Sequence, residues 1–392
     1  MAGLIYLDNA ATSFPKPDVV HDTMTHFYRT CGVNPGRSGC DMALQAEAMV
    51  DGTRRKLSEL FNPSLVAAGK PKDHNRLVFT SNATHSLNLI LKGTVGPGDH
   101  VITTWMEHNS VLRPVNHLVK LGAEATFLRP APDHMVDPEE VRRAIRRNTK
   151  LVMFNHGSNV CGAVQHIPAI GRVCREAGVP LAIDAAQTAG AFPIDMAAWH
   201  VSFLAFTGHK SLLGPTGTGG ICVADDAVVH STMWGGTGVR SAEPFHLEEY
   251  PWRLEAGTLN VQGIAGLAAG VDWVTEHGLE AIHQQEVSLA AMLEDGLRKI
   301  RGVTVYTPAN GQPRVSTLSI NVAGWDASDV GTLLDVDYDI LTRTGLQCAP
   351  KAHEHLGTAP RGTVRFSIGP FNTQEHILAA LKAVEEIAAL RN

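Results

Sequence analysis

The feature that most constrains this chain is an alternation of short apolar runs with amphipathic segments over residues 76–210. The apolar runs predict strands at residues 76–80, 101–104, 123–128, 151–154, 179–183 and 201–206. The segments between them predict helices at residues 81–91, 111–121, 137–147 and 167–177. Strands that are apolar throughout and alternate with helices are typical of a parallel sheet covered on both faces. We therefore expect an α/β fold whose mainly parallel sheet is sandwiched by helices.

The regions on either side of this alternation follow other patterns. A helix is expected at residues 43–61, with buried side chains at Leu44, Ala48, Leu57, Leu60 and Phe61. After Gly257, two helices in succession precede strands at residues 317–322 and 363–368 and a final amphipathic helix. A chain of 392 residues is long enough for two domains. We predict a large domain of residues 14–256 and a smaller α+β domain formed by residues 1–13 and 257–392.

Composition argues against several classes of function. The net charge is −6 and no long basic run occurs, so nucleic acid is not expected as a partner. No run of about 18 apolar residues is present, and the amino terminus lacks the pattern of a signal peptide, so we expect no membrane span and a cytoplasmic protein. The six cysteines include no CxxC pair and do not predict a disulfide framework. Although the chain has 19 histidines, no HExxH motif or Cys/His cluster occurs, and we expect no metal site.

Polar side chains follow the predicted strands of the large domain. In parallel α/β sheets, ligands bind beyond the carboxyl ends of the strands, so these residues are the candidates for a site. The segments that follow successive strands are residues 81–84, Glu107 with His108, residues 155–159, Asp184 with Gln187, and residues 207–210.

Asp184 and Lys210 stand out among these residues. Taken alone, an aspartate after a strand is most often a helix cap, and a lysine after a strand is most often a surface residue. Together, beside the glycine-rich run at residues 214–220, they match the needs of a pyridine-ring aldehyde cofactor. The lysine forms a Schiff base with the aldehyde, and the carboxylate keeps the ring nitrogen protonated so that the ring accepts electrons.

Several ordered motifs extend this pattern over nearly the whole chain. They are Tyr6-Leu7-Asp8-Asn9-Ala10-Ala11-Thr12, Ser158-Asn159-Val160-Cys161-Gly162, the Asp184 and Lys210 blocks, Glu255-Ala256-Gly257-Thr258-Leu259-Asn260, residues 342–349 around Cys348, and Val364-Arg365-Phe366-Ser367. With these motifs the chain resembles the class V aminotransferase-fold enzymes of the cysteine desulfurase and selenocysteine lyase group. The resemblance implies fold type I of the transferases that depend on pyridoxal 5′-phosphate (PLP), which is the aspartate aminotransferase-like fold.

The resemblance also implies how the cofactor is held. Its phosphate would lie at the helix amino terminus that contains Ser81, Ala83 and Thr84, where free N–H groups favour an anion. Thr207 and His209 would donate to the same phosphate. Thr258 would reach the phosphate of a neighbouring subunit, so the complete site would require a homodimer.

The remaining site residues are assigned in the same way. His108 would stack on the pyridine ring and help to move protons, Asp184 would pair with the ring nitrogen, Gln187 would bond the ring hydroxyl, and Lys210 would form the Schiff base. Arg365 would hold the substrate α-carboxylate, because a planar guanidinium binds a carboxylate through two hydrogen bonds. Asn159 would contact the substrate carboxylate or the ring oxygen, and Arg343 would bind substrate and favour the thiolate of Cys348.

Cys348 lies in a glycine-containing loop, whereas most cysteines are small buried hydrophobic residues, as we expect of the other five. The resemblance implies that the Cys348 thiolate attacks the sulfur of L-cysteine, leaving a persulfide on Cys348 and releasing L-alanine. The persulfide would pass to an acceptor protein or a small thiol. L-Selenocysteine is an alternative substrate.

The sequence departs from the family at four positions, and two other functions stay open. Relatives with a short cysteine loop commonly have histidine where Leu346 and Gln347 stand, many have glutamate at His85, and many have histidine at Cys40. Another PLP reaction, such as transamination or β-elimination, would make Cys348 dispensable. A non-catalytic sulfur-trafficking protein is disfavoured because Lys210, Asp184, His108 and Arg365 are all present.

Overall fold

A seven-stranded sheet forms the centre of the larger part of the molecule. The computed structural model describes residues 3–36, 40–70, 72–308 and 311–391. The strand order is β2-β8-β7-β6-β5-β3-β4. The strands are β2 (Leu77–Thr80), β3 (His100–Thr104), β4 (Glu124–Leu128), β5 (Thr149–Asn155), β6 (Leu181–Asp184), β7 (Phe203–Thr207) and β8 (Gly219–Val223). Neighbouring pairs from β7 to β4 are parallel, which confirms the predicted mainly parallel sheet.

The strand β8 was not predicted and is antiparallel to both of its neighbours. Its first residues belong to the glycine-rich run, which the sequence pattern marks as a loop. Gly219 and Gly220 sit where a Cβ would meet the backbone of Asn82 or the ring of Phe206 at less than 3 Å. The glycines therefore allow the strand to pack closely against its surroundings.

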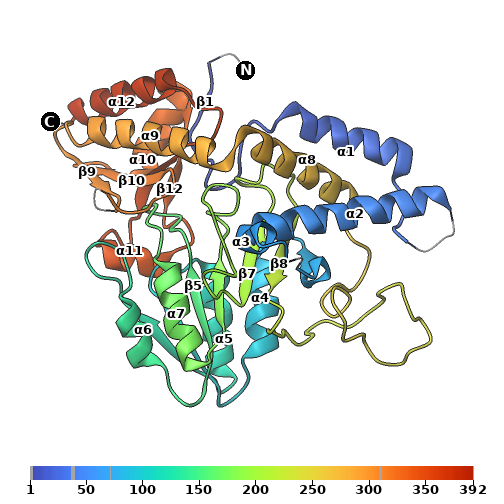
Figure 1. Cartoon of the computed structure of the whole chain (residues 1–392). Coiled ribbons are helices and arrows are strands. Elements are labelled where there is room, and N and C mark those ends of the chain that lie inside the picture. Colours follow the sequence, from blue (N-terminus) through green and yellow to red (C-terminus); the bar gives the residue numbers. More distant parts are fainter. Residues whose placement is uncertain (1–2, 37–39, 71, 309–310, 392) are drawn as a thin grey trace.

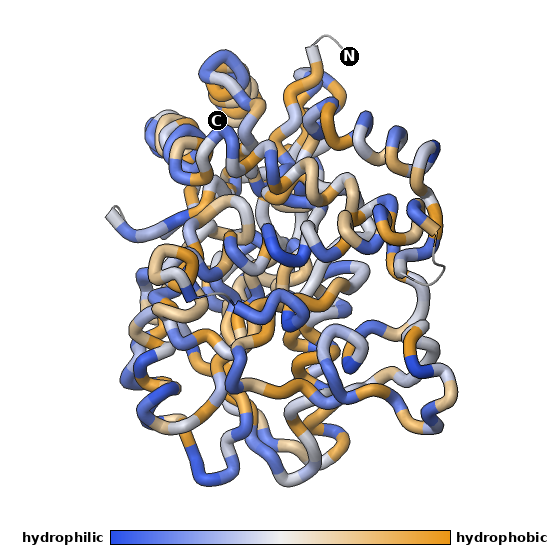
Figure 2. The backbone as a smooth tube through the Cα atoms, turned by 45° about the vertical axis from the view of Figure 1, so that its right-hand side comes forward, coloured by the Kyte–Doolittle hydropathy of each residue, from blue (hydrophilic) through white to orange (hydrophobic). Residues whose placement is uncertain are grey.

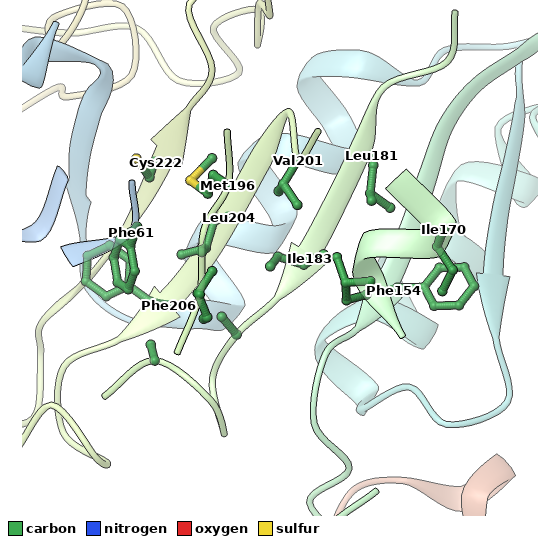
Figure 3. Close-up of a cluster of buried hydrophobic side chains, with 14 of the residues drawn as sticks. Phe61, Phe154, Ile170, Leu181, Ile183, Met196, Val201, Leu204, Phe206 and Cys222 are labelled. Carbon is green, nitrogen blue, oxygen red and sulfur yellow. The ribbon is translucent and has the colours of Figure 1, made fainter. Parts of the chain in front are cut away.

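Helices cover both faces of this sheet (Figure 1). One face packs against α2 (Asp41–Leu60), α6 (Pro138–Ala144), α7 (Ile167–Ala177) and α8 (Val261–His277). The other face packs against α4 (Ala83–Thr94) and α5 (Asn109–Lys120). The side chains alternate as a pleated strand requires, with Leu181 and Ile183 in the first core and Ala182 in the second. Figure 3 shows part of the first core, where the rings of Phe61 and Phe206 lie 5.4 Å apart.

A second, antiparallel sheet lies in the carboxyl-terminal part of the chain. Its order is β12-β13-β10-β9. Its strands are β9 (Val303–Tyr306), β10 (Thr317–Val322), β12 (Arg343–Gly345) and β13 (Thr363–Ser367). The helices α9 (Leu279–Leu297), α10 (Ala327–Tyr338) and α12 (Gln374–Ala389) contribute to the hydrophobic cluster beside this sheet. These are the red and orange elements gathered in one part of Figure 1.

Residues 5–7, near the start of the chain, pack with elements of the carboxyl-terminal part. The strand β1 (Ile5–Tyr6) pairs in parallel with β11 (Ile340–Leu341), and Leu7 is buried in the core of the second sheet. In contrast, α8 packs Ile264, Leu267 and Val271 into the core of the large sheet. The domain boundary at residue 257 stays a prediction.

The remaining elements connect these layers. They are α1 (Asp18–Cys31), α3 (Pro63–Ala67), the 3₁₀ turn η1 (His74–Arg76) and α11 (Pro350–Leu356). The helix α11 belongs to the carboxyl-terminal segment, yet its Ala352 packs with Met106 and Val160 from loops of the large sheet. This contact brings the segment that follows Cys348 against the loops that follow β3 and β5.

The start of α6 follows the capping signal of the sequence. The Asp137 side chain accepts a hydrogen bond from the Glu139 amide at the start of α6, as its start signal predicts.

The predicted burial of Leu44 and Ala48 is wrong, because both are exposed on α2. The buried stripe of α2 instead runs through Ala43, Ala46, Val50 and Leu57.

Hydropathy follows this layering. In Figure 2 the loops at the lower edge are mostly hydrophilic, whereas hydrophobic stretches run through the interior. Among the described residues, no helix has both the length and the apolar character needed to cross a membrane.

A buried ion pair ties the long segment between β8 and α8 to the large sheet. The two terminal nitrogens of Arg54 donate to the two carboxylate oxygens of Glu255 at 2.7 and 2.6 Å. The Phe79 amide also donates to Glu255, and the Arg54 guanidinium lies 4.7 Å from the centre of the Phe79 ring. Both charged side chains are buried, so each depends on the other.

We predict that Glu255→Ala lowers the free energy of unfolding by about 3–5 kcal/mol, because the buried Arg54 charge loses its buried partner and keeps only the longer contact with the exposed Asp51 carboxylate. Urea denaturation followed by circular dichroism measures this change. The control is Asp272→Ala, which removes the exposed ion-pair partner of Lys56. Lys56 lies on α2, as Arg54 does, and the loss of its exposed pair should lower the free energy of unfolding by under about 1 kcal/mol. Equal losses in the two variants would contradict the importance of the buried pair.

Candidate active site

The candidate site lies at the carboxyl ends of the parallel strands. Asn155, at the end of β5, is the register partner of Asp184, at the end of β6, and Asp184 is also paired with Ala205 on β7. The loops after these strands therefore start side by side. They open into a cavity of about 350 Å³.

Most of the predicted site residues line this one cavity. They are Ala83, Thr84, His108, Asn159, Asp184, Gln187, Thr207, His209, Lys210, Arg343, Cys348 and Arg365. Ser81 and Thr258 are not among its lining residues. A larger cavity of about 740 Å³ lies where β6 and β7 begin, and none of the predicted residues lines it. The chemistry of the lining therefore favours the smaller cavity, although it is not the more voluminous one.

Asp184 and Lys210 both line the cavity, and the charge of each affects the pKa of the other. Burial raises the pKa of Asp184, while a hydrogen bond from the Ala186 amide at 2.9 Å and the charge of Lys210 oppose the rise. Burial lowers the pKa of Lys210 to about 8, and the nearby Asp184 carboxylate opposes that change. An amine with this pKa is partly neutral near pH 7, as nucleophilic and general-base chemistry require.

The backbone around Lys210 is fixed by the amino-terminal segment. The His209 carbonyl accepts hydrogen bonds from the Thr12 hydroxyl, the Ser13 amide and the Lys16 ammonium. The Ser13 hydroxyl donates to the Lys210 carbonyl at 2.8 Å. These bonds fix the start of the Lys210 side chain although residues 12–16 are distant in sequence.

The helix α4 presents its amino terminus to the cavity through Ala83 and Thr84. The side chain of Asn82 caps the helix by accepting from the His85 amide. Thr207 and His209 line the same cavity, and burial is the main cause that lowers the pKa of His209 to about 4. The helix terminus provides N–H donors for an anion.

His108 has a defined orientation at the start of α5. Its Nδ1 accepts a hydrogen bond from the Ser110 amide at 3.0 Å and lies 2.8 Å from the Ser110 hydroxyl. This assigns the ring proton of the neutral histidine to Nε2. Burial, followed by the charge of Lys210, lowers the pKa of His108 to about 4, so the ring is neutral near pH 7.

Arg365 is buried and already has partners within the chain. One terminal nitrogen donates to the Asp8 carboxylate and the other to the Asn159 carbonyl, while Nε has no partner among the described residues. Arg343 is its cross-strand neighbour and lies exposed at the cavity. The Asn159 side-chain amide donates to the Gln347 carbonyl at 2.7 Å. The Arg365 guanidinium keeps N–H groups that have no partner, so it can still bind a ligand carboxylate.

Cys348 is exposed, and its backbone carbonyl accepts a hydrogen bond from the Asn109 amide at 2.7 Å. Cys31, Cys161, Cys174 and Cys222 are buried, as expected of structural cysteines. Cys40 is exposed, so the expectation that it is buried is wrong. Burial raises the pKa of the Cys174 thiol to about 12, which keeps this thiol protonated and unreactive.

Sequence reasoning gave no role to several residues that the fold brings to the site. Asp8 pairs with Arg365 across 357 residues of sequence, and Gln347 and Asn82 line the cavity. Asp8 lies in a motif that carried the family resemblance, which was the one available signal for it. Gln187, predicted to bond the cofactor, donates to the Ala10 carbonyl at 3.0 Å. The described residues contain no group of three or more His, Cys, Asp or Glu side chains suited to a metal ion.

Comparisons with known proteins show the family to which the chain belongs. The family model described as aminotransferase class-V matches residues 5–379. The chain is 32% identical to a probable cysteine desulfurase of Methanothermobacter thermautotrophicus, over 98% of this chain and 95% of that protein. It is 30% identical to the cysteine desulfurase CsdA of Escherichia coli, over 98% and 94% of the two chains. The apo structure of a cysteine desulfurase from Thermococcus onnurineus NA1 matches with a TM-score of 0.89 at 32% identity, covering 98% and 95% of the two chains.

The fold is that of the PLP-dependent transferases of fold type I, as the family resemblance implied. Within that class, the chain belongs to the aminotransferase class-V family, whose members depend on PLP.

We predict that iodoacetamide labels Cys348 in the native protein and spares the four buried cysteines at pH 7.5. The reagent reaches only thiols that are exposed at the surface. Burial also raises the pKa of Cys161, Cys174 and Cys222, so these thiols stay protonated and do not react. Peptide mass spectrometry measures the labelling. The exposed Cys40 is the internal reference, and denatured protein should be labelled at all six positions. Native labelling of Cys174 at the rate of Cys348 would contradict the prediction.

Proposed function

We propose that this chain is a PLP-dependent cysteine desulfurase that converts L-cysteine to L-alanine and takes up the sulfur on Cys348. The observation that carries the proposal is that Cys348 lines the same cavity as Lys210, Asp184 and Arg365. One small cavity thus combines an amine, a buried carboxylate, a substrate-binding cation and a thiol. The printed names of the relatives support the same reaction.

The cavity suits PLP in its chemistry. Lys210 provides the amine for the aldehyde, and Asp184 provides a buried carboxylate for the ring nitrogen. The amino terminus of α4 with Thr84, together with Thr207 and His209, would hold the phosphate. The side-chain oxygens of Asn155 and Asn159 are buried, line the cavity and have no partner among the described residues, so they can accept hydrogen bonds from a bound group. His108 would lie against the ring, and Gln187 would bond its hydroxyl.

The chain's own residues would divide the reaction between them. PLP supplies an electron sink for the negative charge that develops at the substrate α-carbon. Arg365 and Arg343 hold the substrate α-carboxylate, with Asn159 beside it. Lys210 takes the proton from the substrate α-carbon, and its pKa of about 8 suits this task. His108, neutral with its proton on Nε2, would assist proton movement beside the ring.

Cys348 would complete the sulfur transfer. Its thiolate attacks the substrate sulfur, the new S–S bond forms a persulfide on Cys348, and the bond between sulfur and the substrate β-carbon breaks. Protonation of the remaining three-carbon unit gives L-alanine. The reaction is balanced without an external oxidant or reductant, since L-cysteine and the Cys348 thiol become L-alanine and the Cys348 persulfide. The exposed position of Cys348 leaves the persulfide open to an acceptor protein or a small thiol.

The assembly that we propose is a homodimer. Thr258 lies outside the cavity of its own chain, as expected of a residue that would bind the phosphate of a neighbouring subunit. The segment that leads to it exposes large apolar side chains, with Phe245 84% and Trp234 69% accessible. Exposed apolar groups of this size favour association. We propose the cytoplasm as the compartment, because the six cysteines include no CxxC pair and the sequence predicts no disulfide framework.

The test is the reaction of the purified holoenzyme with L-cysteine and a reductant. We expect L-alanine and sulfide in equal amounts, and we expect Cys348→Ala to abolish both while it keeps the Schiff-base absorbance. Lys210→Ala should lose that absorbance and the activity together. Formation of pyruvate, consumption of a keto acid or full activity of Cys348→Ala would replace desulfuration by another PLP reaction.

The pH dependence gives a second prediction. Burial lowers the pKa of Lys210 to about 8, so the fraction of neutral amine rises with pH and kcat should rise about tenfold from pH 7 to pH 9. The measurement is kcat at saturating L-cysteine across this range. A rate that falls over the same interval would show that deprotonated Lys210 does not limit the reaction.

A further inference from the structure

Cys348 lies in a turn with an unusual backbone. Gln347 has a φ of 40° and Cys348 a φ of 58°, so two consecutive residues other than glycine occupy the left-handed region. Residues other than glycine rarely adopt this conformation, because their Cβ atom comes too close to the following carbonyl oxygen. Strained residues of this kind persist only where the surrounding contacts hold them, and they concentrate at functional sites.

The contacts that hold this turn converge on the side chain of Gln347, which is only 7% exposed. Its Nε2 donates to the Thr363 carbonyl at 3.0 Å on β13. Its Oε1 lies 2.7 Å from Nε2 of His353, on α11, and 3.3 Å from the Thr363 hydroxyl. The side chain thus joins the turn to the strand and the helix that enclose it.

The protonation of His353 follows from this arrangement. Because the amide Nε2 of Gln347 donates to a carbonyl, its Oε1 is the acceptor, and His353 must carry its proton on Nε2. The His353 Nδ1 then accepts from the Thr358 hydroxyl at 2.7 Å. His353 is fully buried, and burial lowers its pKa to about 4, so the neutral ring persists at working pH.

Two backbone contacts connect the same turn to the cavity wall. The Asn159 side chain donates to the Gln347 carbonyl, and the Asn109 amide donates to the Cys348 carbonyl, each at 2.7 Å. The thiol of Cys348 is therefore presented at the cavity by a turn that is held from three directions.

We propose that Gln347 and His353 form a buried anchor that holds Cys348 in its left-handed conformation, which makes Gln347 a positioning residue for the nucleophile. The inference rests on the proposed desulfurase reaction for its kinetic consequence. It also gives a role to one of the positions where this sequence departs from its family. The anchor acts mainly on sulfur transfer, because the thiol belongs to the turn, whereas the backbone of Lys210 is held separately by Thr12, Ser13 and Lys16.

The test compares holoenzyme variants by hydrogen–deuterium exchange and by kinetics. In Gln347→Leu, which keeps the size of the side chain and removes its hydrogen bonds, amides of residues 343–352 should exchange about tenfold faster. The kcat for L-alanine formation should fall at least about tenfold, with KM for L-cysteine changed less than about threefold. Exchange of the α-proton of L-alanine with deuterium, which needs Lys210 but not Cys348, should be retained.

Two further variants keep the result interpretable. Thr358→Val removes only the hydroxyl that fixes the His353 proton, so it should produce the same changes more weakly and still fold. His355→Ala is the matched control on the same helix, because its ring contacts His134 and not the turn. It should match the wild type in every measurement.

Each outcome supports or overturns the proposal. Unchanged exchange at residues 343–352 in both Gln347→Leu and Thr358→Val would overturn the anchor, as would an equal loss of sulfur transfer and of α-proton exchange. If the wild type forms no L-alanine from L-cysteine, the proposed function fails, while the hydrogen–deuterium comparison still decides whether the anchor exists.

Discussion

The parallel pairing of β5, β6 and β7 is the constraint on which the rest of the site depends. Their register places Asn155 beside Asp184, and Asp184 beside Ala205, two residues before the end of β7. β5 and β6 end here and β7 ends two residues later, so the loops that follow must satisfy their polar groups with side chains and with one another. Buried polar groups accumulate there because the strands end inside the molecule, covered by helices on both faces.

Burial then determines the charge of each group at the site. The cavity is enclosed enough to lower the pKa values of Lys210, His108 and His209 and to raise that of Asp184. Desolvation penalises each charged form, so a charge persists only where an opposite charge lies close. Asp8 is such a partner for Arg365. The amino-terminal residues and the second sheet are thus part of the electrostatics of a site built on the first sheet.

The sequence predicted those elements whose signal is local. Apolar strands and capped helices were found in the right order, since periodicity and capping act within a few residues. The strand β8 was missed because its glycines indicate a loop, whereas their reason is a close approach to Asn82 and Phe206. Leu44 was assigned to the core because it is apolar, yet the contact stripe of α2 is set by the orientation of the whole helix.

The amino-acid sequence by itself determined the alternating strands and helices of residues 76–210, the mainly parallel sheet and the polar residues at the strand ends. These properties follow from short-range periodicity and from the rule that parallel strands share one carboxyl edge. Only the tertiary structure decided that Asp8 pairs with Arg365 and that Gln347 bonds His353 and Thr363 around the Cys348 turn. Contacts of this kind depend on the packing of two sheets, and a partner hundreds of residues away leaves no local pattern from which the pair could be identified.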